Sequence, residues 1–134
     1  MRYSHFVKDY FMLNVTKHFS LDECKCPCCD RVKITPGFFA HMEKLEEMRQ
    51  KLGFTLIITS GYRCPNHNTN IEGAPNSWHL LYATDIRPNW SAGFANRLRA
   101  MYRVALVQNW GGIGYYSSWI HLDMRTKTTR WRKP

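Results

Sequence analysis

Apolar positions along the chain predict alternating helices and strands. The first convincing helix opens at Thr35 and Pro36, because proline suits the first turn of a helix. Apolar residues then recur at helical spacing on one face, at Phe38, Met42, Leu45 and Leu52. Gly53 is expected to end this helix, since glycine readily adopts the left-handed conformation that closes many helices.

The remaining pattern predicts a small sheet and one more long helix. A continuous apolar run at 54–59 is short enough for a buried strand, and about twenty mostly polar residues follow it as a loop. Ser91 is the expected N-cap of a helix over 92–107. Further strands are expected at 82–86, 113–116, 119–124 and 128–131, with a hairpin turn at Ser117 and Ser118. This order indicates an α+β fold, with helices on one face of a small antiparallel or mixed sheet.

A chain of this length is expected to form one domain over residues 1–134, and we expect a monomer. Residues 1–19 are interpreted as an N-terminal arm that carries scattered aromatic residues: Tyr3, Phe6, Tyr10, Phe11 and Phe19. Ser20 and Glu23 match a capping box, which predicts a helical turn starting at Leu21. Residues 125–134 are interpreted as a basic C-terminal tail.

Composition narrows the class of protein. A hydrophobic content of 44% argues against disorder, and no apolar run approaches the roughly 20 residues that span a bilayer. Lys8 and Asp9 interrupt any apolar signal core, so we expect cytoplasmic synthesis and delivery to a target by a phage or another route. The net charge of +9 favours polyanions, either nucleic acid or anionic polymers of the bacterial envelope.

Two histidines and one aspartate stand beside the predicted strand ends. His79 and Asp85 flank the start of the strand at 82–86, and His121 lies in the last part of the hairpin. Each of them alone could be an ordinary surface or loop residue. Together they match the ligand set of a catalytic zinc, which keeps its fourth position open for water.

Cysteines suggest a second metal site. Four of the five cysteines lie between 24 and 29, and an odd count without a signal peptide argues against a secreted disulfide framework. Cys26 and Cys29 have the spacing of one half of a structural zinc site, and Cys64 and His67 have the spacing of the other half. The alternative is that these residues are free thiols, packed as small hydrophobic side chains.

The polar loop carries a resemblance to a known family. It reads S-G-Y-R at 60–63, N at 68, G-A at 73–74 and N-S-x-H at 76–79. These motifs resemble the zinc D-Ala-D-Ala peptidases of peptidoglycan, which share a metal centre with lysostaphin-type peptidases and the hedgehog signalling domain. The segments G-G-I-G-Y-Y at 111–116 and H-L-D at 121–123 are similar to the closing part of the small, single-domain members.

This resemblance implies a hedgehog/DD-peptidase-like zinc fold and a set of roles. By position, it implies zinc ligands at His79, Asp85 and His121. It also implies that Arg63 stabilises an oxyanion or binds a substrate carboxylate, and that Asn68 and Ser77 shape the substrate cleft. The alternative for Arg63 is a structural clamp on the asparagine-rich loop.

Two positions depart from the family pattern. The family usually spaces its first histidine and aspartate by six residues, with a glycine three residues after the histidine; here the spacing is five, and Tyr82 replaces the glycine. Many members place an acid three residues before the last ligand, where this chain has Ser118. Asp123 shares strand parity with His121, so it could orient that imidazole or act as the general base, and we favour orientation.

Three functions follow from these patterns. The first is a zinc-dependent peptidoglycan peptidase, such as a phage lysin, which cleaves next to a D-amino acid in the stem peptide or crossbridge as a carboxypeptidase or endopeptidase. The second is a catalytically weak or inactive wall-binding module that keeps the zinc fold. The third, a zinc-stabilised nucleic-acid binder, is disfavoured because no basic helix with interleaved base-reading residues is evident.

Overall fold

The computed structural model describes residues 13–133, so Tyr3, Phe6, Tyr10 and Phe11 of the expected arm lie outside the described residues. Within the described part of the arm, Phe19 is buried in the core. Glu46 of helix α2 (Pro36–Leu52) holds this segment, because it accepts hydrogen bonds from the Thr16 hydroxyl at 2.8 Å and the His18 amide at 2.9 Å. The N-terminal segment is therefore fastened to the domain from residue 13 onward.

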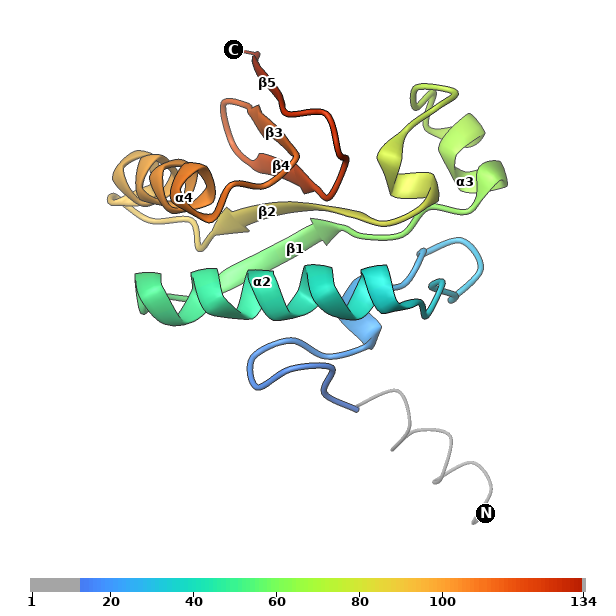
Figure 1. Cartoon of the computed structure of the whole chain (residues 1–134), viewed down its shortest axis with the longest axis horizontal. Coiled ribbons are helices and arrows are strands. Elements are labelled where there is room, and N and C mark those ends of the chain that lie inside the picture. The colour runs from blue at the N-terminus through green and yellow to red at the C-terminus, as the bar shows by residue number, and fades with distance from the viewer. Residues whose placement is uncertain (1–12, 134) are drawn as a thin grey trace.

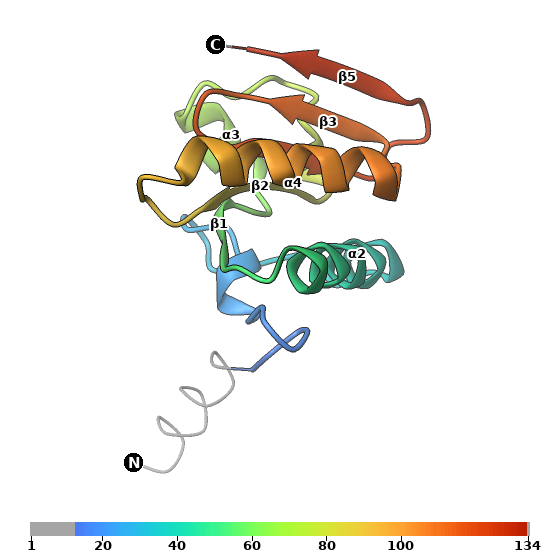
Figure 2. The ribbon, with the colours of Figure 1, turned by 90° about the vertical axis from the view of Figure 1, so that its left-hand side faces the viewer.

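Two long helices form where the apolar period predicted them. Helix α2 (Pro36–Leu52) begins at Thr35, whose side chain accepts from the Phe38 amide, and it ends at Gly53 with a φ of 74°. Helix α4 (Phe94–Gln108) begins two residues later than expected, since Gly93 rather than Ser91 is its N-cap. The two helices contact one another and cross steeply, with α4 running across the view in Figure 2 and α2 nearly end-on.

Three short helices complete the helical part of residues 13–133. The first, η1 (Asp22–Cys24), forms at the predicted capping box, where Glu23 accepts from both the amide and the hydroxyl of Ser20. The expected polar loop contains the other two, α3 (Pro65–Asn70) and η2 (Trp78–Leu80). The loop prediction was wrong there, because side chains cap both helices without any apolar period: Cys64 caps α3 and Ser77 caps η2.

The sheet has five strands in the order β1-β2-β4-β3-β5. Their bounds are β1 Leu56–Ser60, β2 Ala83–Pro88, β3 Gly112–Tyr115, β4 Ile120–Asp123 and β5 Thr129–Arg132. Strands β3 and β5 are parallel, and the other neighbours are antiparallel, so the sheet is mixed. The predicted α+β fold and the hairpin between β3 and β4 are confirmed, and the basic tail contributes the edge strand β5 (Figure 1).

The two faces of the sheet carry different side chains, because successive residues of a strand point to opposite faces. One face packs against α2 and α4 and contributes buried residues to the core: Ile86, Ile113, Ile120 and Leu122. The intervening positions, which include Asp85, His121 and Asp123, point to the opposite face. Strand parity thus places an apolar core on one side and every candidate ligand from the strands on the other.

A buried histidine lies at the core side of the sheet. The imidazole of His41 is fully buried between the rings of Tyr82 and Trp110, and its Nε2 lies 2.9 Å from the Thr84 hydroxyl. Burial lowers the pKa of His41 to about 3, with a smaller contribution from His121. His41 is therefore a neutral core residue.

Within residues 13–133, none of the helices has the length and apolarity that a bilayer span requires.

Candidate metal centre and active-site pocket

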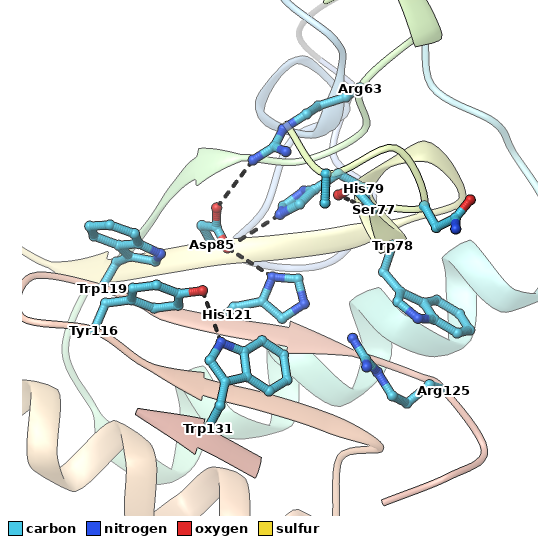
Figure 3. A pocket seen from close by; sticks show the side chains of 12 residues that line it. Arg63, Ser77, Trp78, His79, Asp85, Tyr116, Trp119, His121, Arg125 and Trp131 are labelled. Carbon is cyan, nitrogen blue, oxygen red and sulfur yellow. Dashed lines mark hydrogen bonds and ion pairs between the residues drawn. The ribbon is translucent and has the colours of Figure 1, made fainter. Parts of the chain in front are cut away.

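Three separate elements bring His79, Asp85 and His121 together. His79 lies in η2, and Asp85 and His121 are paired across β2 and β4. One Asp85 oxygen, Oδ1, lies 3.3 Å from His79 Nε2 and 3.1 Å from His121 Nδ1. The ligand atoms of all three residues lie within 4.8 Å of one another, and Figure 3 shows both imidazoles directed at the carboxylate.

In each imidazole, the nitrogen that points away from Asp85 makes a hydrogen bond, which leaves the nitrogen that faces Asp85 available to a metal. His79 Nδ1 lies 2.7 Å from the Gly61 carbonyl oxygen, which only accepts, so Nδ1 must donate and Nε2 carries the lone pair. This Nε2 is buried and has no hydrogen-bond partner. His121 Nε2 lies 2.7 Å from Asp123 Oδ2 and donates to it, which frees Nδ1. Two nitrogen lone pairs and a carboxylate therefore face one point, as a zinc ion requires.

The shortened spacing between His79 and Asp85 does not separate them. Tyr82, which replaces the usual glycine, turns into the core, where its hydroxyl donates to the sulfur of Met42 at 3.3 Å. Strand β2 then begins at Ala83, and Asp85 reaches the cluster from the third position of the strand. The five-residue spacing is thus compatible with the ligand geometry.

Asp123 lies behind His121 relative to the cluster. His121 presents Nδ1 to Asp85 and Nε2 to Asp123, so the imidazole separates the two carboxylates. Arg125 donates to Asp123 from Nε at 2.8 Å, from a terminal nitrogen at 2.6 Å and from its backbone amide at 3.1 Å. The Asp123 side chain is fully buried, and all of its described partners hold it towards the ring. This placement suits orientation of His121.

The pKa values follow from these contacts. Burial alone would raise the pKa of Asp85, but the neighbouring imidazoles of His121 and His79 outweigh burial and hold it well below its usual range. The pKa of Asp123 is likewise low, because Arg125 and His121 outweigh its burial. Burial would lower the pKa of His121, but Asp123 and Asp85 raise it. Both carboxylates are therefore ionised, and Asp85 is the one that faces the cluster with its charge available to a cation.

Arg63 lies at the edge of the cluster, and the two predicted cleft residues have different positions. A terminal nitrogen of Arg63 lies 3.7 Å from Asp85 Oδ2, and the other donates to Asn68 Oδ1 at 3.2 Å. Asn68 is buried, donates to the Ala74 carbonyl and does not line the pocket. Ser77 does line the pocket, and it also accepts from the His79 amide. Asn68 thus supports Arg63 from behind, whereas Ser77 faces the open space.

A pocket of about 400 Å³ opens over the cluster. Its walls are rich in aromatic residues that sequence reasoning did not single out: Trp78, Tyr116, Trp119 and Trp131. Tyr116 and Trp119 are stacked with ring centroids 4.4 Å apart, and Trp131 lies over His121 at 5.2 Å (Figure 3). The signal that could have found them is their closeness in sequence to the ligands, as in W-H at 78–79 and W-I-H at 119–121.

Arg125 is a second cation in this pocket that was missed, since its sequence position placed it in the basic tail. Its guanidinium lies between the indoles of Trp78, at 5.5 Å, and Trp131, at 5.2 Å. Cation–π contacts and the Asp123 pair together fix its position. Two arginines, Arg63 and Arg125, therefore line the pocket together with the cluster.

The cysteines form a separate group. The sulfur atoms of Cys26, Cys29 and Cys64 lie within 4.8 Å of one another, so the structure brings together three of the four residues predicted for a second metal. The fourth, His67, meets the group through its backbone amide, which donates to Cys64 Sγ at 3.4 Å, and its ring is not part of the group.

Comparison with known proteins tests the resemblance. A search of the curated proteins finds no significant match. A scan against family models gives one, described as Peptidase M15, over residues 17–123. The match begins before Phe19 and ends at Asp123, so it includes every residue of the histidine–aspartate cluster and the Cys26, Cys29 and Cys64 group. With most of its length covered by this model, the chain belongs to the Peptidase M15 family and is a metallopeptidase by family.

Proposed function

We propose that the protein is a zinc-dependent peptidase of bacterial peptidoglycan, which cleaves next to a D-amino acid in the stem peptide or crossbridge. The observation that carries this proposal is the convergence of His79, Asp85 and His121 at the floor of an open pocket in an M15 chain. Zinc in a site with three protein ligands supplies Lewis acidity, which polarises a carbonyl and acidifies water.

The arginines of the pocket suit an anionic or polar peptide. The Arg63 guanidinium is held by Asn68 and Ser60, so its remaining donors are fixed at the edge of the cluster. A fixed guanidinium pairs well with a carboxylate or with an oxyanion that develops during attack on the amide. Arg63 is thus proposed to stabilise that oxyanion or to bind a terminal carboxylate of the wall peptide.

Proton transfer must take place without the acidic residue that many family members carry three residues before the last ligand. Hydrolysis adds hydroxide to the scissile carbonyl carbon and a proton to the departing amine. Among the described residues that line the pocket, Asp85 is the only carboxylate, and Ser118 occupies the position where many members carry an acid. Tyr116 is a lining residue whose hydroxyl accepts from Trp131 Nε1 at 2.9 Å, which leaves its own proton to donate into the pocket. We assign that donation to Tyr116, which would then recover a proton from solvent, where the attacking water has released its own.

The test is digestion of purified peptidoglycan by zinc-loaded protein. The released muropeptides are separated and weighed by mass spectrometry, which also locates the cleaved bond. We expect cleavage by the wild type and none by His121→Ala, which removes one ligand from β4. A wild type that holds zinc but leaves every peptidoglycan chemotype intact contradicts the proposed activity.

A wall-binding module is the second candidate, and the serine at position 118 favours it. In that case the protein should sediment with insoluble peptidoglycan without releasing fragments. Binding is compared on walls with and without teichoic acid. This comparison separates binding of peptidoglycan in the pocket from electrostatic attraction to anionic polymers, which the net charge of +9 would support. Binding that disappears with the anionic polymer is electrostatic, whereas binding that survives its removal is specific to peptidoglycan.

A further inference from the structure

The sulfur atoms of the cysteine group have the spacing of a metal–thiolate centre. Cys26 Sγ and Cys64 Sγ lie 3.7 Å apart, and both lie within 4.8 Å of Cys29 Sγ. Zn–S bonds of about 2.3 Å in a tetrahedron place the sulfurs about 3.8 Å apart. A disulfide would instead require about 2.05 Å. The observed separation therefore matches sulfurs that share one ion.

The loop that carries the first cysteines has a fixed backbone. The Cys26 amide donates to the Arg31 carbonyl at 2.8 Å, and the Asp30 amide donates back to the Cys26 carbonyl at 2.8 Å. Asp30 closes this turn in the left-handed conformation, with a φ of 56°. Such a turn brings Cys26 and Cys29, three residues apart, to one side of the loop, as in C-x2-C halves of structural zinc sites.

One further contact and one neighbouring thiol belong to the site. The His67 amide donates to Cys64 Sγ, and an amide donor stabilises a thiolate. Cys28 lies outside the group of sulfurs within 4.8 Å, but it directly precedes Cys29 in the same loop and its side chain is exposed, which makes it the candidate for a fourth ligand. Cys24 is separate, since its sulfur contacts the Ser20 carbonyl at 3.5 Å and Met42 Sδ at 3.9 Å in the core.

We propose that Cys26, Cys28, Cys29 and Cys64 hold a structural zinc ion, distinct from the ion expected at His79, Asp85 and His121. This ligand set replaces the His67 ring of the sequence prediction by the Cys28 thiol. Binding releases the thiol protons to solvent and needs no oxidant or reductant. The proposal does not depend on the peptidase activity, because the two sites share no ligand.

The thiolate site would fix the segment that leads into the active site. Cys64 directly follows Arg63, and the Tyr62 amide donates to the Cys24 carbonyl at 3.0 Å. The carbonyl of Gly61 accepts from His79 Nδ1. One short segment, 61–64, thus connects the cysteine loop to a zinc ligand and to the pocket arginine. The ion would act on catalysis only through their positions.

Zinc stoichiometry of protein purified under reducing conditions tests the site. We expect two zinc ions per chain in the wild type and one in His121→Ala, with the second ion retained there. Cys28→Ser, at an exposed position, and Cys64→Ser should each also hold one. Cys24→Ala is the matched control, because Cys24 is a neighbouring cysteine outside the group, and it should keep two. Cobalt bound to His121→Ala should show intense thiolate-to-metal charge-transfer absorption.

A readout on the wild type keeps the test independent of variant folding. A mercurial reagent that titrates thiols should release one zinc per chain in step with modification of four thiols. The proposal is overturned if the wild type holds at most one zinc and His121→Ala holds none. It is also overturned by a Cys26–Cys64 disulfide in the native protein, or if His67→Ala loses one zinc while Cys28→Ser keeps both.

Discussion

His121 and Asp123 lie two residues apart on β4, and His121 Nε2 donates to Asp123 Oδ2 across 2.7 Å. Strand alternation explains the pair, since residues i and i+2 share one face of a sheet. Because Asp123 accepts the hydrogen bond from Nε2–H, the proton stays on Nε2, and Nδ1 faces Asp85 with its lone pair. We therefore propose that Asp123 is a positioning residue that sets the tautomer of His121, a proposed metal ligand, and its partner Arg125 holds it in place.

Asp123→Asn should weaken zinc binding rather than abolish turnover at saturating metal. A partner of this kind typically contributes about 10- to 100-fold in metal affinity or activity. We expect zinc affinity, measured by competition with a chelator, to fall by that factor and excess zinc to restore most of the rate of peptidoglycan cleavage. A loss of rate that saturating zinc does not restore, at unchanged affinity, would assign the general base to Asp123 instead.

Arg63→Lys should reduce kcat/KM while leaving the metal in place. Lysine keeps the charge but loses the rigid fork that is held between Asn68 and the cluster. Loss of one oxyanion donor typically costs about 100- to 1000-fold in kcat. The matched control is Arg99→Lys on the exposed side of α4, which should change neither kcat/KM nor zinc content. Normal kinetics with a stability loss in Arg63→Lys would favour the structural clamp instead.

The sequence predicted the helices and strands in which apolar residues recur at regular spacing. Apolar spacing predicted α2 and α4, and strand parity predicted that His121 and Asp123 share one face of the sheet. Helices α3 and η2 were missed because they are short and polar, and their ends are fixed by side-chain caps on Cys64 and Ser77. Local propensity carries little information about such elements.

The candidate site was predicted less completely, because the direction of each side chain determines which residues take part in it. The two histidines and Asp85 could be selected by residue type and by their place at strand ends. Asn68 has a polar side chain in a functional loop, but its direction towards Arg63 depends on the turn of α3. The pocket walls were missed because Trp78 and Trp131 come from η2 and β5, which meet only through the tertiary fold.

The free energy of unfolding should fall below about pH 6.5 through His41. The folded protein lowers the pKa of His41 to about 3, whereas the unfolded chain restores its ordinary value of 6.5. Between these values the unfolded state binds the extra proton, so stability decreases as pH falls, by at most about 1.4 kcal/mol per pH unit. Urea unfolding at several pH values checks the slope. His41→Gln should be less steep between pH 6 and 4, and an identical slope would contradict the assignment.

Gly112→Ala should disturb the metal centre from behind. Gly112 is paired with Asp123 across β3 and β4, and an added Cβ would collide with both oxygens of the Asp123 carboxylate. Asp123 cannot withdraw easily, because Arg125 and His121 hold it on its other sides. Overpacking of this kind typically costs about 1–3 kcal/mol. We therefore expect a lower melting temperature and weaker zinc binding at the histidine site.

The matched control for Gly112→Ala is Gly37→Ala at the start of α2. There an added Cβ would meet only the Thr35 hydroxyl, at 3.7 Å, which is an ordinary contact. Alanine is favoured over glycine within a helix by about 1 kcal/mol, so Gly37→Ala should be neutral or stabilising. The decisive comparison is zinc affinity by chelator competition in the two variants. If Gly112→Ala keeps the wild-type affinity although its stability falls, Asp123 does not act on the metal through His121.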